Sequence, residues 1–436
     1  MSSLVATAAH FTDRRPLWPS VLMFVYGAGW SFSLNSIGYV YGAELVALMF
    51  LPFVGVIGAM RRYALLRSVL VAYAFILAGL IVADIANQTP FELALKGWAT
   101  PASGAVCLMF VVALLDRNPN AIFGFFVGLI LFTLVLGPET YAVSGRKGEL
   151  AWQLALENSN IFKIRIVPFL LPLLVLCIQY LQPRSRVLAG VFAIVGVVAF
   201  ALFGARSAAL ILFVVAIAST FISPLRKIAS GKLLMIAALG AAIGYLGFAA
   251  YVNYSLASGG DGHSAQQLAR IDSPYNPLEL LGIGRSEWLT APAVISERPI
   301  FGYGSWAYDT GGHFTFLRAT LTNEMQAYHA YYAHRLQLVP AHSVLLTSWI
   351  WGGLIGFWGA LLLGRAITRG VAGTFRPGAP LMVIGVYLAI TVLWDFLFSP
   401  FQTIRLNFPH GIGFMIVIHS IVPQIENRNF KTWRST

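Results

Sequence analysis

The stretch ALLRSVLVAYAFILAGLIVADIA, residues 64–86, decides the fold class of this chain. It carries only two charged side chains, Arg67 near its start and Asp84 near its end. A helix of this length measures roughly 34 Å, which is enough to cross the hydrocarbon core of a bilayer, about 30 Å thick. Because lipid offers no hydrogen-bond partner to the backbone, the stretch is expected to be a membrane-spanning helix.

The composition of the whole chain agrees with this expectation. Of its 436 residues, 58% are hydrophobic and only 11% are charged, and the mean hydropathy is +0.74. Soluble domains carry about 25% charged residues. Such a low charge cannot cover a globular surface in water, so a soluble enzyme is excluded. Two cysteines and many bulky apolar residues also exclude a disulfide scaffold and a disordered chain.

Twelve apolar runs in the sequence have the length of a membrane-spanning helix. They predict an all-α polytopic membrane protein with about 12 transmembrane helices. The runs lie near residues 17–36, 38–60, 64–86, 97–115, 121–137, 166–182, 187–205, 207–223, 233–252, 342–364, 380–398 and 409–424.

The distribution of basic residues predicts the orientation of these helices. Cytoplasmic loops carry an excess of Lys and Arg. Both termini and every connection after an even-numbered run are basic, so we expect both termini in the cytoplasm. This side holds 17 of the 29 basic residues and three acids, whereas the other side holds 12 basic residues and 14 acids. The net charge of +12 is therefore a topology signal, and no basic patch remains for nucleic acid.

The predicted domains follow from the loops. Residues 1–252 form the first nine spans, residues 253–341 form one large outer loop of 89 residues, and residues 342–436 form the last three spans with a cytoplasmic tail. A loop of this length is too long for a bare connection, so function is expected there. Within it, residues 285–298 and 314–336 have the apolar spacing of helices.

Arg206 is the most unusual charge near a predicted span. It lies between two apolar runs, on the side where the positive-inside rule disfavours basic residues. It is either a helix-end residue that snorkels to the interface or a buried contact for an anion such as phosphate, which the planar guanidinium fits well. Three carboxylates at outer helix ends are expected to be structural partners of that charge rather than catalysts: Glu44, Asp84 and Asp395.

The large loop offers further candidates but no metal motif. Its arginines include Arg285, and His342 closes it at the start of the tenth span. The spacing of His329 and His334 does not align two zinc ligands on one helical face, so neither a metal nor another cofactor is expected.

Three segments, taken in chain order, resemble one protein family. They are GARSAALILFVVAIA (204–218), GRSEWLTAPAVISERPIFGYGSW (284–306) and AHSVLLTSWIWGGLIGFWGALLLG (341–364). Together with twelve spans and a large loop between spans nine and ten, they resemble the O-antigen ligase and Wzy-type O-antigen polymerase superfamily over about residues 190–365. The resemblance implies a fold like that of the GT-C-type membrane glycosyltransferases, in the bacterial inner membrane, with the large loop in the periplasm.

The resemblance also implies a reaction. Members move a glycan from an undecaprenyl-diphosphate carrier to an acceptor hydroxyl without metal or nucleotide sugar, and inversion at the anomeric carbon is expected. It maps the diphosphate-contacting arginines onto Arg206 and Arg285 and the catalytic base onto His342. Two arginines can meet the charge of the leaving diphosphate, and a histidine titrates near neutral pH. Supporting roles are possible for Trp288, Tyr303 and Asp395, where the aromatic rings either stack on sugars or lie in the interfacial belt.

The sequence leaves four candidate functions open. A ligase would transfer the glycan to lipid A-core, a polymerase to a second lipid-linked glycan, and a protein glycosylase to Ser or Thr. The single large loop favours the ligase over the polymerase. A transporter for lipid-linked sugars is the alternative from another class, but transporter sites lie near the bilayer midplane, whereas the polar residues here gather at the outer edge.

Overall fold

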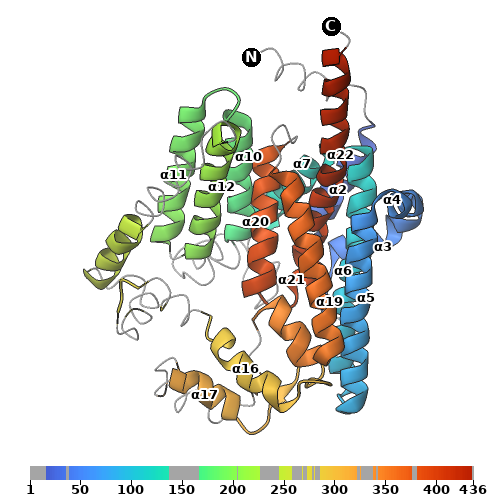
Figure 1. Cartoon of the computed structure of the whole chain (residues 1–436), viewed down its shortest axis with the longest axis vertical. Coiled ribbons are helices and arrows are strands. Elements are labelled where there is room, and N and C mark those ends of the chain that lie inside the picture. The colour runs from blue at the N-terminus through green and yellow to red at the C-terminus, as the bar shows by residue number, and fades with distance from the viewer. Residues whose placement is uncertain are drawn as a thin grey trace.

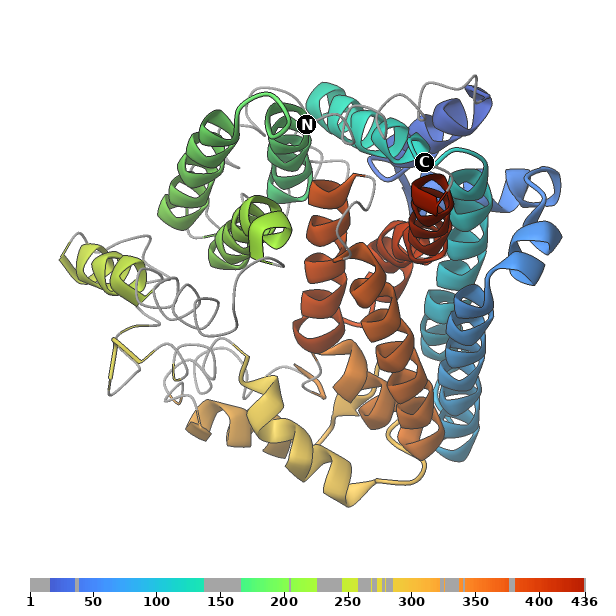
Figure 2. The ribbon, with the colours of Figure 1, turned by 45° about the horizontal axis from the view of Figure 1, so that its top comes forward.

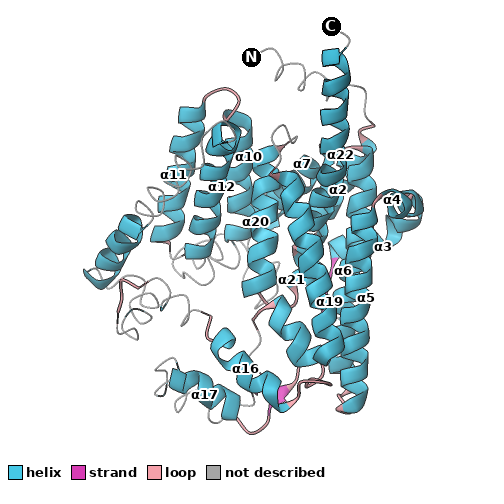
Figure 3. Ribbon diagram, in the orientation of Figure 1, coloured by secondary structure: helices cyan, strands magenta, loops and turns pink. Residues whose placement is uncertain are grey.

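The described part of the chain is almost entirely helical (Figures 1 and 3). The computed structural model describes residues 16–35, 39–136, 166–203, 205–225, 245–257, 268, 273–276, 279, 285–321, 325, 337–339, 342–375 and 381–434. Its helices are α2 (Trp18–Gly29), α3 (Gly42–Phe50), η2 (Leu51–Phe53), α4 (Val56–Arg62), α5 (Ala64–Ala86), α6 (Phe91–Arg117), α7 (Ala121–Leu136), α10 (Val167–Leu181), α11 (Arg186–Leu202), α12 (Arg206–Leu225), α16 (Glu287–Glu297), α17 (His313–Leu321), α19 (Val344–Thr374), α20 (Met382–Phe398), α21 (Thr403–Leu406) and α22 (Phe408–Arg434).

Strands are short in the described part of the chain. β1 (Ser33–Asn35) pairs antiparallel with β2 (Tyr39–Tyr41), and β3 (Tyr308–Asp309) pairs antiparallel with β4 (Gln337–Leu338). The second pair joins a strand that lies just before α17 to a strand that lies just before α19.

The architecture is that of an all-α membrane protein. Three described helices, α5, α6 and α19, are long and apolar enough to cross a bilayer, and a fourth span results if the broken pair Gly42–Phe53 and Val56–Arg62 is counted as one. Shorter apolar helices lie beside them: Ala121–Val135, Val167–Leu181, Arg186–Leu202, Arg206–Ile217, Met382–Phe398 and Phe408–Ile421. The total of twelve spans stays a prediction.

Most predicted runs coincide with helices, and two differ in an instructive way. The run near 38–60 is a helix broken by 85°, because Pro52 lies in the η2 turn and Gly55 adopts a left-handed φ of 76°. Within the run near 17–36, helix α2 ends at Gly29, and the chain then enters strand β1. Of the run near 233–252, only residues from 245 onward are described, and they are helical through 257.

Glycines bring α5 and α19 into close contact, and the two helices run side by side in both ribbon views (Figures 1 and 2). A Cβ added to Gly79 of α5 would lie 2.7 Å from Gly352 O and 2.8 Å from Gly356 Cα. A Cβ on Gly359 would lie 2.7 Å from Ile76 N. Small residues at membrane helix interfaces allow the backbones to approach and to gain dispersion contacts. The glycines therefore let the backbones of α5 and α19 pack directly against each other.

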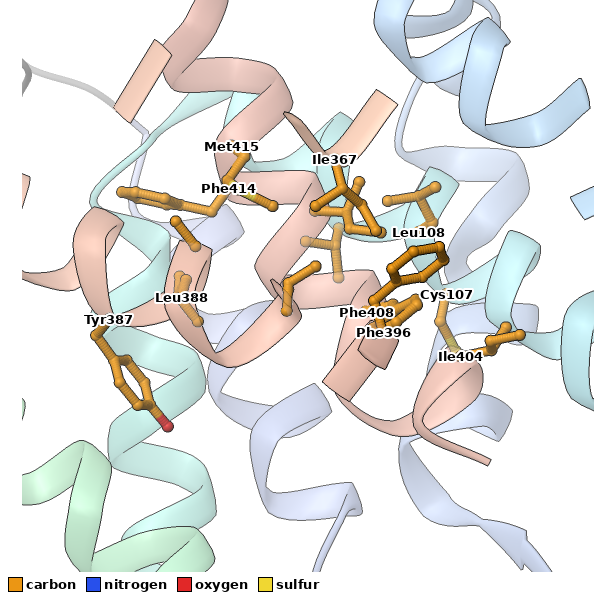
Figure 4. Packing of buried hydrophobic residues seen from close by; sticks show 14 of the residues in the cluster. Cys107, Leu108, Ile367, Tyr387, Leu388, Phe396, Ile404, Phe408, Phe414 and Met415 are labelled. Carbon is orange, nitrogen blue, oxygen red and sulfur yellow. The ribbon is translucent and has the colours of Figure 1, made fainter. Parts of the chain in front are cut away.

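The hydrophobic core lies between α6, α19, α20 and α22. Phe408, Phe414 and Met415 of α22 pack in one cluster with Cys107 and Leu108 of α6, and the same cluster includes Ile367 and Leu388 (Figure 4). All seven of these side chains are essentially fully buried.

Helix α19 is interrupted one third of the way along by Gly353, whose φ of 60° and ψ of −156° belong to a region that only glycine readily adopts. A preceding segment of the chain supplies the hydrogen bonds that the break removes. Tyr303 N donates to Ile350 O at 2.8 Å, Gly304 N donates to Trp351 O at 3.1 Å, and Leu354 N donates to Ile300 O at 2.9 Å. We call this arrangement the α19 clasp: residues 300–304 bonded to residues 350–354.

The clasp fixes residues 285–321, which contain α16 and α17, at one end of the bundle. We call these residues the outer segment. In Figure 1, α16 and α17 lie at the bottom, whereas the connection between α10 and α11 and the end of α22 lie at the top. The predicted orientation assigns the bottom to the outer side.

Candidate functional site

Three segments meet at the lower end of the bundle and bring predicted site residues together. They are the start of α16, the start of α19 and the last turn of α20. Residues far apart in sequence, near 285, 342 and 395, are thereby placed in one neighbourhood.

His342 lies just before α19, and the local sequence holds it there. Ser343 is the N-cap of α19, and its Oγ accepts a hydrogen bond from Leu346 N at 3.3 Å. Serine is a preferred N-cap because its side chain satisfies an unpaired amide of the first turn. The same Oγ also donates to Phe396 O of α20 at 3.4 Å. The helix start, and with it His342, is thus fixed against the end of α20.

The imidazole of His342 faces a carboxylate on one side and solvent on the other. Its Nδ1 lies 3.4 Å from Oε1 of Glu287, in the first turn of α16. The His342 side chain is 51% exposed, whereas that of Glu287 is only 13% exposed. A histidine with one nitrogen beside a carboxylate and half its surface open can accept a proton from a bound molecule.

Arg285 lies two residues before α16, and its guanidinium lies 5.6 Å from the ring centroid of Trp394. Burial lowers its pKa, and the nearby carboxylates of Glu287 and Asp395 oppose that shift. An arginine remains charged in proteins even so. The result is a partly desolvated cation at the edge of the bundle, where it is able to bind an anion strongly.

Asp395 is buried in the last turn of α20 and is held by two donors. Ser399 Oγ donates to its Oδ1 at 2.7 Å, and Asn407 Nδ2 donates to its Oδ2 at 2.7 Å. Both carboxylate oxygens are therefore engaged, and Asp395 acts on the site through its negative charge near Arg285. Its expected supporting role is compatible with this position.

Trp288 anchors α16 to α20. Its indole Nε1 donates to Leu397 O at 2.9 Å, and its ring lies 5.9 Å from that of Phe398 at an interplanar angle of 47°. The polar edge of the indole is thus occupied within the protein.

Tyr303 lies at the opposite end of α16 from His342. Its hydroxyl donates to Glu297 Oε2 at 2.8 Å, and the guanidinium of Arg298 lies 4.9 Å from its ring centroid. Burial and the Glu297 carboxylate raise its pKa. Since Glu287 and Glu297 are separated by ten residues of helix, roughly 15 Å, Tyr303 belongs to a second polar group that also contains His313, whose Nε2 is 3.1 Å from Glu297 Oε1.

Arg206 begins α12, which packs against α20. Its guanidinium lies 5.4 Å from the ring centroid of Tyr251 in the helical segment 245–257. The diphosphate role assigned to Arg206 stays a prediction.

The outer carboxylates have partners other than the expected one. Glu44 Oε2 lies 2.5 Å from Arg405 NH2 of α21, so this arginine, and not Arg206, is the partner that the structure shows for Glu44. Both side chains are largely buried, which explains why the charges are paired.

Asp84 holds the turn that leads out of the clasp. Its Oδ1 accepts from Ser305 N at 2.6 Å, and its Oδ2 accepts from Ser305 Oγ at 2.8 Å and from Trp98 Nε1 at 2.7 Å. This carboxylate is structural, as expected, but it serves the outer segment and not an arginine.

Two contributors to the site escaped the sequence analysis: Glu287 and Asn407. Glu287 stands within the quoted segment GRSEWL, only two residues after Arg285. Its helical range predicts a side chain in the first turn of α16, but nothing local indicates that it faces a histidine 55 positions later in the chain. Asn407 lies between α21 and α22, where an asparagine ordinarily reads as a turn residue.

No group of three or more His, Cys, Asp or Glu side chains able to hold a metal ion is found among the residues that the structure describes. Three residues of the sequence analysis lie outside the described residues: His329, His334 and Gly204. The chain matches no protein-family model and no curated protein sequence.

Proposed function

We propose that this protein is a membrane glycosyltransferase that moves a glycan from an undecaprenyl-diphosphate carrier to an acceptor hydroxyl at the periplasmic face of the bacterial inner membrane. The observation that supports this proposal best is the neighbourhood shared by Arg285, Glu287 and Asp395 with His342. A desolvated cation and an accessible base, held together at one end of an apolar bundle, suit transfer from a lipid-linked anion.

The reaction requires few groups. The acceptor oxygen forms a bond to the anomeric carbon while the bond from that carbon to the diphosphate oxygen breaks. His342 takes the proton of the acceptor hydroxyl, and the electron pair leaves with the lipid diphosphate. Arg285 stabilises the negative charge that develops on the diphosphate, and Arg206 is the second proposed contact. In-line displacement inverts the anomeric centre. The proposed chemistry uses no metal and no cofactor.

Lipid A-core is the acceptor that we propose, which makes the protein an O-antigen ligase. The main competitor is a Wzy-type polymerase, in which the acceptor is a second lipid-linked glycan at the same site. The single large outer loop favours the ligase. A transporter of lipid-linked sugars is a further alternative, but the ionisable residues of this site lie at helix ends. Arg285 lies just before α16, His342 just before α19 and Asp395 in the last turn of α20.

The test uses the full-length protein in detergent or nanodiscs with an undecaprenyl-diphosphate glycan donor and chelator. One reaction contains rough lipopolysaccharide as acceptor, and the other contains the donor alone. We expect a glycan on the lipid A-core that His342→Ala and Arg285→Ala both lose while their melting temperatures stay near that of the unmodified protein. Growth of the donor in the second reaction would establish the polymerase instead. No transfer in either reaction, with a folded protein, would overturn the proposal.

A further inference from the structure

The contact between His342 and Glu287 joins two segments that the described fold holds independently in place. Oε1 of Glu287 lies 3.4 Å from Nδ1 of His342. Two further charged groups are linked to this pair: Arg285, which lies two residues before Glu287 and interacts electrostatically with it, and Asp395 on α20, which also interacts with Arg285.

A residue next to each member of the pair donates a hydrogen bond to a backbone carbonyl at the end of α20. The α16 side is fixed by Trp288, whose Nε1 donates to Leu397 O at 2.9 Å. The α19 side is fixed by Ser343, whose Oγ donates to Phe396 O at 3.4 Å. Because these carbonyls belong to adjacent residues, the separation of Glu287 and His342 is set by short, direct connections and not by the long outer segment between them.

We propose that Glu287 is a positioning residue that holds His342 with Nδ1 turned inward and Nε2 turned toward the acceptor. This inference rests on the proposed function, since it assigns the base its orientation. A carboxylate beside Nδ1 favours the tautomer with a proton on that nitrogen, and it leaves Nε2 as the acceptor of a proton.

The charge of Glu287 has a second effect on the same step. When His342 takes the hydroxyl proton, the imidazole becomes a cation, and a carboxylate 3.4 Å away stabilises it. The partial burial of Glu287 strengthens this attraction, because solvent screens it less. Arg285 reduces the benefit, since its positive charge also lies near Glu287. The main expected effect of Glu287 is therefore the fixed orientation of the His342 ring.

The same helix supplies a matched control. Glu297, at the other end of α16, also lies beside a histidine, with Oε1 3.1 Å from His313 Nε2, but it is 48% exposed. Glu297→Gln makes the identical chemical change in the same helix, and it breaks a carboxylate–histidine contact that the proposal gives no role in transfer.

The experiment compares Glu287→Gln, Glu287→Ala and Glu297→Gln with the unmodified full-length protein. Two quantities are measured: the kinetic constants kcat and KM, and the tautomer of His342 from the ¹⁵N shifts of its two ring nitrogens by NMR on protein with labelled histidine, assigned with His342→Gln. In Glu287→Gln we expect kcat to fall roughly 10- to 100-fold with little change in KM, and the fraction of neutral His342 with its proton on Nδ1 to fall. Glu287→Ala should lose more, because it keeps no oxygen to orient the ring. Glu297→Gln should change neither quantity.

Each outcome separates the two proposals. An unchanged His342 tautomer in Glu287→Gln would refute the positioning role. So would a loss expressed as a higher KM at constant kcat, because Glu287 would then act through the binding of the diphosphate by Arg285. If the tautomer changes as expected but the unmodified protein transfers no glycan to any acceptor, the pairing is correct and the proposed function is wrong. The role of Glu287 in transfer is then wrong as well.

Discussion

Replacing Gly353 by alanine should release the α19 clasp. A Cβ at this position would overlap the carbonyl oxygen of Ile300 and lie 2.7 Å from the carbonyl carbon of Phe301, both of which are backbone atoms that cannot rotate away. The φ of 60° and ψ of −156° add strain, because a residue with a side chain pays about 1–3 kcal/mol in such a region.

The size of the effect follows from what the segment must do to avoid this overlap. If residues 300–304 move away, the three hydrogen bonds of the clasp are lost, each with a net contribution of about 1 kcal/mol. Whichever route the protein takes, strain or loss of the bonds, the cost is on the order of 2–4 kcal/mol. This cost should be concentrated at the outer segment, since α5 and α19 still pack through their other glycines.

The assay combines thermal unfolding in detergent with limited proteolysis of the outer segment and the transfer reaction. Gly353→Ala should lower the melting temperature and expose residues 285–321 to protease first. Gly190→Ala in α11 is the control, because no atom lies within 4 Å of the added Cβ. It should be neutral or stabilising, since alanine favours a helix by up to about 1 kcal/mol over glycine. A Gly353→Ala protein that unfolds and resists protease like the control would refute the reasoning.

Three further substitutions test the contacts around the site. Arg285→Lys keeps the charge but loses the planar fork of the guanidinium, so glycan transfer should fall roughly tenfold or more at unchanged melting temperature. The control, Arg298→Lys at the far end of α16, should transfer normally, and equal rates in both variants would contradict a diphosphate contact. Asp84→Asn leaves at least one of the three donors around this carboxylate facing the amide NH2 group, which should lower the free energy of unfolding by about 1–3 kcal/mol. An unchanged melting temperature would show that other contacts hold the turn at Ser305. Trp288→Phe keeps an aromatic ring but removes the donor to Leu397 O, so kcat should fall severalfold while the free energy of unfolding falls by only about 1 kcal/mol. A change in KM alone would argue for a sugar contact instead.

The apolar segments and their helices could be predicted from the sequence because each depends on neighbouring residues only. Residues 64–86 form α5 with the expected bounds, and the spacing within residues 285–298 predicts α16. The break of 85° after η2 does not follow from apolar run length, because the run near 38–60 is continuous in hydropathy, and only Pro52 and Gly55 within it indicate the bend.

The partners of the polar residues could not be predicted in the same way. Arg285, His342 and Asp395 can be named from their residue types and from a resemblance, whereas Glu287 is brought to His342 by the packing of α16 against α19. Arg405 was missed as the partner of Glu44, because 361 positions separate them and no periodicity relates them.

The α19 clasp makes part of one helix depend on an earlier segment of the chain for its backbone hydrogen bonds. The carbonyls of Ile350 and Trp351 and the amide of Leu354 find their partners in residues 300–304, which leave the ribosome earlier. Without residues 300–304, the backbone groups at the break in α19 would lack these partners, and hydrocarbon penalises each unpaired group by several kcal/mol. The interrupted form of α19 therefore depends on the preceding segment, so a change in residues 300–304 should alter the shape of a helix about 50 residues later in the chain.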